Sequence, residues 1–167
     1  EDCFLEAMNA DPGYGEAWTN LGVLGWTAEK RGEALDYLKK GFVLSPSVPD
    51  HSTLYHSAVT SLGKYSDAED VFREARGLYP NHKNCAFLYI DALIQQGKFS
   101  VAMTEVEDAI ALFGLDEGIL AAALSVREKL GPRAPGKKGF KKATLSVCMI
   151  VKNEEEHLIK CLKSVRD

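Results

Sequence analysis

Apolar and small residues recur along most of the chain at the three-to-four-residue spacing of amphipathic helices. Glycine and proline divide these stretches. Gly63 and Gly97 each end a predicted helix. Pro46 and Pro80 each end the second helix of a predicted pair and begin the turn into the next pair. Residues 66–69, with the order S-x-x-E, match a capping box that would open a helix. The pattern predicts pairs of short antiparallel helices.

The pattern repeats every 34 residues, which indicates a repeat architecture. The columns in phase are Pro12, Pro46 and Pro80; Ala34, Ala68 and Ala102; Ala7, Gly41, Ala75 and Ala109; and Phe4, Leu38, Phe72 and Val106. In each second helix, two small residues seven apart flank a bulky one on the same face. Small side chains let a neighbouring helix come close, and the bulky one fills the remaining space.

The period sets the domain organisation of the first three quarters of the chain. We predict three full units at 15–48, 49–82 and 83–116. Residues 1–14 are predicted to be the second helix of an incomplete unit, so we expect the chain to be a fragment of a longer protein. Residues 117–130 are predicted to form a last helix that covers the open face of the solenoid.

These columns resemble the tetratricopeptide repeat (TPR). The residues that carry the resemblance are Trp18, Leu21, Gly22, Ala34, Leu38, Gly41 and Pro46 in the first unit; Tyr55, Gly63, Tyr65, Ala68, Phe72, Ala75 and Pro80 in the second; and Tyr89, Gly97, Phe99, Ala102, Val106 and Ala109 in the third. The resemblance implies an all-α fold, a right-handed α-α superhelix of helix-turn-helix repeats. His56 and Ile90 depart from it, because the family prefers a small residue there.

The TPR resemblance also implies a binding groove lined by the first helix of each unit. The candidate partner-binding residues are Thr19, Val23, Trp26, Thr53, Ser57, Thr60, Phe87, Asp91 and Gln95. The groove positions are polar with hardly any positive charge. Thr19 and Val23 stand where some family members need Lys or Asn to clamp a peptide carboxylate, so we do not expect that clamp. Trp26 has two readings, packing inside the solenoid or contact with a protein, peptide or glycan partner.

The last 24 residues follow a different pattern. Residues 145–151 are a continuous apolar run, typical of a strand buried on both faces of a parallel sheet. Asn153 is a good N-cap, and three glutamates follow it in what would be a first helical turn. Residues 144–167 therefore predict a truncated first β-α unit of an α/β domain, which one strand and one helix cannot stabilise alone.

This segment resembles the start of a family 2, GT-A-type glycosyltransferase. The carrying residues are Leu145, Ser146, Val147, Met149, Ile150, Val151, Lys152, Asn153, Glu154, Glu155, Leu158, Cys161, Leu162, Ser164 and Val165. The resemblance implies that Ile150, Lys152 and Asn153 belong to a donor-nucleotide pocket. The family's D-x-D motif and catalytic carboxylate are not in the chain, so we assign no catalytic or metal-binding residue and no cofactor. A longer parent enzyme would use a nucleotide-sugar donor with Mn²⁺ or Mg²⁺.

Charge adds a boundary to this picture. The net charge of the chain is −4, but residues 1–130 carry −9, residues 131–143 carry +5 and residues 144–167 are neutral. The Gly-, Pro- and Lys-rich segment 131–143 is predicted to be a linker. With Phe140 as its one aromatic residue, it does not indicate nucleic-acid binding. No apolar run is long enough to span a membrane, and the four cysteines lack the spacing of a zinc site. No secretory signal is visible, so we expect four reduced thiols in a cytoplasmic protein.

The sequence thus supports two hypotheses about function. In the first, the repeats are an interaction module that positions an acceptor, protein or glycan, for a nucleotide-sugar-dependent glycosyltransferase. In the second, the repeats are a TPR scaffold for protein–protein interaction with no enzymatic role. The oligomeric state is left open by the sequence.

Overall fold

The computed structural model describes residues 2–131, which are entirely helical and turn structure. The predicted linker after residue 131 and the predicted β-α unit at 144–167 lie outside the described residues. Within residues 2–131 there are eight helices: α1 (Asp2–Ala10), α2 (Gly15–Thr27), α3 (Arg31–Leu44), α4 (Pro49–Leu62), α5 (Tyr65–Leu78), α6 (Lys83–Gln95), α7 (Phe99–Phe113) and α8 (Glu117–Leu130). The predicted helix pairs are confirmed.

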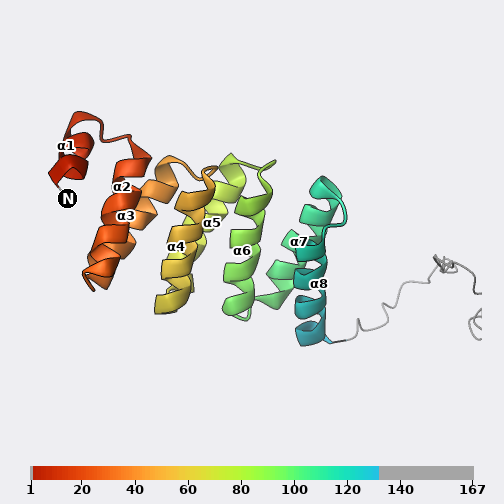
Figure 1. Cartoon of the computed structure of the whole chain (residues 1–167). Coiled ribbons are helices and arrows are strands. Elements are labelled where there is room, and N and C mark those ends of the chain that lie inside the picture. Colours follow the sequence, from red (N-terminus) through yellow and green to blue (C-terminus); the bar gives the residue numbers. More distant parts are fainter. Residues whose placement is uncertain (1, 132–167) are drawn as a thin grey trace, which may run out of the picture. The chain divides into compact units, whose positions relative to one another are not determined.

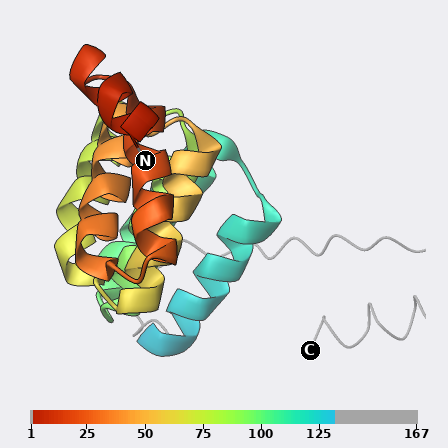
Figure 2. The same cartoon turned by 60° about the vertical axis from the view of Figure 1, so that its left-hand side comes forward.

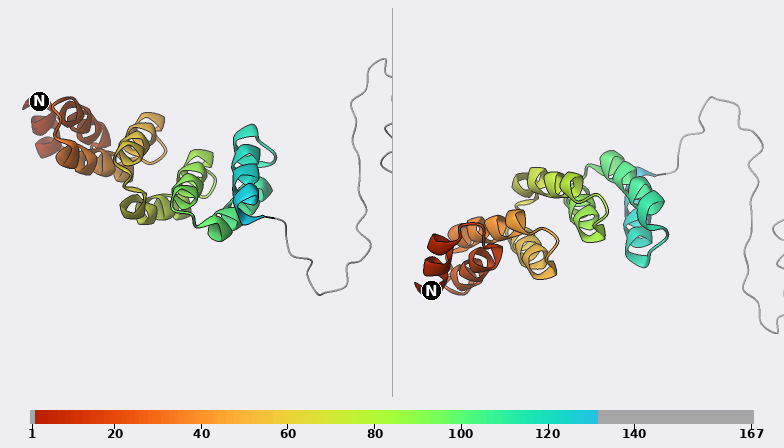
Figure 3. Two further views of the ribbon diagram at one scale, coloured as in Figure 1. Left: turned by 90° about the horizontal axis from the view of Figure 1, so that it is seen from below. Right: turned by 90° about the horizontal axis from the view of Figure 1, so that it is seen from above.

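The helices follow one another along a row, with α1 and α8 at opposite ends (Figures 1 and 3). The first helix of each pair contacts the first helix of the next, in the order α2, α4, α6 and α8. The second helices α3, α5 and α7 pack against the first helix of the following pair. This arrangement is an all-α helical solenoid, in which the first helices form one continuous layer.

The small–large–small columns of the second helices form the core, as predicted. Their nine members are Ala34, Leu38 and Gly41 in α3; Ala68, Phe72 and Ala75 in α5; and Ala102, Val106 and Ala109 in α7, and all are buried. Each column presents the same face to the first-helix layer. Burial of this apolar surface is the main favourable contribution to the stability of such stacked helices.

An aromatic cluster joins the first two repeats. The Phe42 ring from α3 stacks on Tyr55 from α4 at a centroid distance of 5.5 Å, and both contact Phe72 from α5. All three side chains are buried. Burial raises the pKa of the Tyr55 hydroxyl to about 12. The hydroxyl therefore stays neutral across physiological pH, and the cluster carries no charge.

Two glycines allow α2 and α3 to pack at very close range. A Cβ atom on Gly22 would lie 2.5 Å from Cγ of Leu38, and one on Gly41 would lie 2.1 Å from Oγ1 of Thr19. In the next repeat the position of Gly22 is taken by His56, and the backbones of α4 and α5 approach each other much less closely. The departure from the repeat pattern at His56 therefore loosens one helix pair.

The helix ends agree with the sequence prediction at the glycines but not at the predicted capping box. Gly63 ends α4 and Gly97 follows α6, and both adopt the left-handed conformation with φ of 63° and 71°. The predicted capping box at Ser66 is wrong, because α5 already begins at Tyr65 and its N-cap, Lys64, makes no side-chain cap bond. The helix begins two residues earlier than a Ser66 cap would place it, so Ser66 lies inside the helix.

The last helix covers the preceding pair with only part of its apolar surface. Ile119 and Val126 of α8 are buried, and its start is capped by Asp116, whose side chain accepts a hydrogen bond from Gly118 N. Leu124 of the same helix is 71% exposed. Figure 2 shows α8 inclined to the helices before it.

We predict that Gly41→Ala destabilises the protein by about 1–3 kcal/mol, because the new methyl group would overlap Thr19 and separate α2 from α3. Gly32→Ala in the same helix is the matched control, since nothing lies within 4 Å of its Cβ position and alanine favours a helix. Urea denaturation followed by circular dichroism would measure both. Equal stability of the two variants would contradict the close-packing role of Gly41.

Candidate functional site

The layer of first helices places most of the predicted groove residues on one surface. We call the surface formed by α2, α4 and α6 the first-helix face. Val23, Thr53, Ser57, Thr60 and Gln95 are exposed there, and Trp26, Phe87 and Asp91 are partly buried. The residues on this surface have different surroundings, which are described one by one below.

The hydroxyl of Thr19 is engaged within the fold. Thr19 is buried, and its hydroxyl donates a hydrogen bond to the carbonyl oxygen of Gly15 at 3.1 Å. The same hydroxyl oxygen lies where a Cβ atom on Gly41 would be placed. Thr19 therefore belongs to the contact between α2 and α3, which its position in the repeat does not reveal.

Phe87 is also engaged within the fold. Its ring lies 3.0 Å from the Cβ position of Gly118 at the start of α8. The Nζ atom of Lys83 lies 6.0 Å from the ring centroid and forms an ion pair with Asp116 at 2.6 Å. Phe87 thus anchors α8 to α6.

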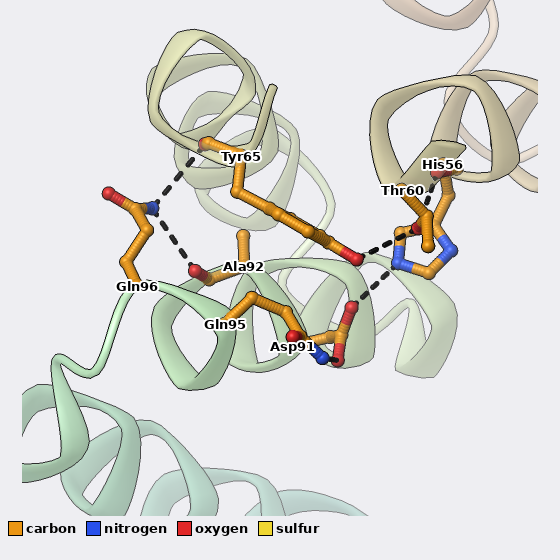
Figure 4. A network of polar contacts seen from close by, with 7 residues as sticks. All are labelled: His56, Thr60, Tyr65, Asp91, Ala92, Gln95 and Gln96. Atoms are coloured by element: carbon orange, nitrogen blue, oxygen red, sulfur yellow. Dashed lines mark hydrogen bonds and ion pairs between the residues drawn. The ribbon is translucent and has the colours of Figure 1, made fainter. Parts of the chain in front are cut away.

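A polar network crosses from α4 to α6 (Figure 4). His56 Nε2 lies 2.8 Å from an Asp91 carboxylate oxygen, and Gln95 donates to the other oxygen at 3.2 Å. Tyr65 donates its hydroxyl hydrogen to Thr60 at 2.9 Å. The hydrogen bond from His56 holds the pKa of Asp91 below its ordinary value, against the opposing effect of partial burial. The charge of the Asp91 carboxylate therefore stabilises contacts within the protein, to His56 and Gln95.

An apolar slot lies between α2 and α4, with a volume of about 150 Å³. Val23, Trp26 and Leu54 line it together with Ser57, and Leu38 of α3 lies among the lining residues. The guanidinium of Arg31 lies 4.3 Å from the centroid of the Trp26 ring. Trp26 packs against the core of the solenoid and also lines the apolar slot. Its surroundings therefore combine the two predicted alternatives, packing inside the solenoid and a surface open to a partner.

A larger cavity, of about 700 Å³, lies between the N-terminal halves of the same two helices. Residues of the turns before α2 and α4 complete it, among them Asp11, Tyr14 and Ser45. This cavity depends on two turns, about 34 residues apart in the sequence, that come together only in the folded chain, so no local sequence pattern marks it. The only hint is that the repeat period brings equivalent turns to the same side of a solenoid.

Within residues 2–131, no group of three His, Cys, Asp or Glu residues is placed to hold a metal ion. No helix in that range is long and apolar enough to cross a membrane. Ile150, Lys152 and Asn153, the predicted donor-pocket residues, lie outside the described residues.

Comparisons with known proteins agree with the fold. Residues 59–123 match the family model described as a tetratricopeptide repeat. No curated protein matches the sequence. Three solved structures are similar over most of their own length. They are the first TPR domain of human RPAP3 (TM-score 0.55, 21% identity, 71% of this chain and 94% of that one), the Sgt2 TPR domain from Aspergillus fumigatus (0.54, 14%, 77% and 90%), and the first TPR of Spaghetti (RPAP3) bound to the HSP90 peptide SRMEEVD (0.54, 20%, 70% and 93%).

At these identities the solved structures establish the fold alone. Together with the family match, they show that the described part of the chain is a TPR-like helical solenoid. The chain departs from a regular array of such repeats at His56, which takes a position where the first repeat has glycine. His56 instead links α4 to α6 through Asp91.

We predict that Asp91→Asn lowers stability by about 1 kcal/mol at neutral pH, because a charge-assisted hydrogen bond between α4 and α6 is weakened. The pKa of Asp91 is lower in the folded chain than its ordinary value of 3.8. Its contribution is therefore complete above that value and is lost as the pH falls through the folded pKa.

Urea denaturation at several pH values between neutrality and the acid range would measure this effect. The difference between wild type and Asp91→Asn should shrink as the pH falls below 3.8. Asp108→Asn, at an exposed position of α7, is the control and should stay close to wild type throughout. A difference for Asp91→Asn that is independent of pH would contradict the charged hydrogen bond.

Proposed function

We propose that this chain is a protein-interaction module that holds a partner peptide against the first-helix face, between α2 and α4. The observation that carries the proposal is the apolar slot at Trp26, which is open beside exposed polar residues of both helices. An aromatic side chain in a partly buried apolar slot, surrounded by polar groups, is a typical anchor point for a peptide.

The peptide in the Spaghetti (RPAP3) complex, SRMEEVD, offers a useful contrast. Within α2, α4 and α6, the charged residues are Glu16, Asp50, Asp91 and Lys83. Lys83 is paired with Asp116. A peptide rich in Glu and Asp would therefore meet like charge on this face, so we propose that the partner is not of that kind.

A finer proposal rests on the sequence of residues 144–167. Their resemblance to the start of a family 2 glycosyltransferase supports a parent enzyme in which the repeats position an acceptor. Ile150, Lys152 and Asn153 would then contact the donor nucleotide. A D-x-D-like acidic pair encoded after residue 167, and saturable UDP-sugar binding that needs Mn²⁺ or Mg²⁺ in the longer protein, would support this proposal. Peptide binding without donor binding would favour the scaffold.

We predict that Trp26→Ala weakens peptide binding by at least about tenfold, because it removes the largest apolar surface of the slot. Binders selected from a random peptide library by the full chain would be measured by fluorescence polarisation. Trp18→Phe is the control, since the Trp18 ring lies on another surface of α2, against Tyr37 and Lys40.

Circular dichroism would verify that both variants remain folded. Equal affinity of the selected peptides for wild type and Trp26→Ala would show that the slot is not the binding site. A library that yields no binder to the wild-type chain would contradict the proposed function itself.

A further inference from the structure

The cavity of about 700 Å³ and the apolar slot lie end to end between α2 and α4. Leu54 lines both of them. On α2 the cavity is bordered by residues 15–20 and the slot by residues 23–27, so one follows the other along the helix axis. A single extended ligand can therefore occupy both.

The cavity is acidic. Asp11, Glu16 and Asp50 line it, and no Lys or Arg is among the lining residues of this part of the structure. Glu16 accepts a hydrogen bond from the Tyr14 hydroxyl at 2.7 Å, and Asp11 accepts one from Gly13 N at 2.9 Å. The hydrogen bond to Glu16, together with the negative charge of that carboxylate, raises the pKa of the Tyr14 hydroxyl. These bonds come from neutral donors, so the negative charges are not neutralised.

A buried polar group in the cavity wall also lacks a partner. His51 lines the cavity and is only 6% exposed, and its Nδ1 atom has no hydrogen-bond partner among the described residues. Polar nitrogens that are buried and unpaired cost free energy, and a bound group can remove that cost. The cavity wall thus holds an uncompensated polar group beside the three carboxylates.

We propose that the cavity receives a Lys or Arg side chain of a partner peptide whose large apolar side chain enters the slot at Trp26. This inference rests on the proposed function and adds the chemistry of the partner. Three carboxylates without a cation favour a positively charged group, and Arg or Lys can also reach several acceptors at once. Arg31 stacks on Trp26 at the other end of α2, so the two ends of the groove differ in charge.

The geometry also sets the spacing of the two anchors. The cavity and the slot are bordered by α2 residues about seven positions apart, which corresponds to about 10 Å along a helix. One turn of a polyproline II helix advances about 9 Å over three residues and returns side chains to the same face. The cationic and the apolar residue of the peptide should therefore be three positions apart.

The test uses the full chain and synthetic Pro- and Ala-rich peptides that carry one Arg and one Leu three positions apart. Matched peptides carry Gln or Glu in place of Arg, or have Arg and Leu adjacent. The indole N–H signals in nitrogen–proton NMR spectra report binding. Trp26 lines the slot, whereas the indole N–H of Trp18 is bonded to the Pro12 carbonyl on another surface and serves as an internal control.

We expect the Arg peptide with three-residue spacing to shift the Trp26 signal at the lowest concentration. The double variant Glu16→Gln/Asp50→Asn should bind this peptide about fivefold more weakly than wild type. Added salt should also weaken binding of the peptide to wild type. The matched control is Glu74→Gln/Asp108→Asn, which removes the same charge from exposed positions of α5 and α7 and should leave binding unchanged.

Equal Trp26 shifts with the Arg, Gln and Glu peptides would overturn the cationic specificity and leave the proposed function standing. An unchanged affinity of the Glu16→Gln/Asp50→Asn variant for the Arg peptide would also overturn the cationic specificity and leave the proposed function standing. If no peptide shifts Trp26, both proposals fail. Concentration-dependent dimers that disappear in the double variant would show that a second copy of the chain fills the cavity, which overturns the assignment to a partner protein.

Discussion

The distance between two packed helices is set by the side chains between them, and the rest of this structure depends on that constraint. In α3 the small residues Ala34 and Gly41 let α2 come close, while Leu38 fills the space between them. The same arrangement in α5 and α7 keeps the repeats in one row. Since no helix pair can bury its apolar face alone, each repeat requires its neighbour, and the first helices are brought into one layer.

That layer explains why the binding surfaces lie between α2 and α4. Leu54 faces the space between these helices. At the N-terminal ends of α2 and α4, the turns before the two helices line this space with polar residues. Between α4 and α6 the corresponding space is crossed by the pair of His56 and Asp91 and by Gln95. One interhelical space is therefore open to a ligand, while the next is occupied by the chain's own hydrogen bonds.

Sequence reasoning works well where a local rule decides the outcome. Gly63 ends α4 because only a left-handed residue fits there, and the 34-residue columns identify the buried face of each second helix. It works less well where the outcome depends on residues distant in the sequence. Thr19 looks like a groove residue by repeat position, but its burial follows from the missing side chain at Gly41. The unpaired nitrogen of His51 depends on surroundings that no repeat pattern specifies.

The wide packing of α4 on α5 has a consequence for how the array unfolds. Stability in a linear array passes only from neighbour to neighbour, so the weakest interface defines where cooperativity breaks. In the second repeat the backbones of α4 and α5 lie farther apart than those of α2 and α3, although the Tyr55 and Phe72 rings still join them. His56, which occupies the glycine position there, also fastens α4 to α6. The residue at the wider helix pair thus ties the second repeat to the third, so the coupling between these repeats runs through a side-chain bond as well as through stacking of the helices.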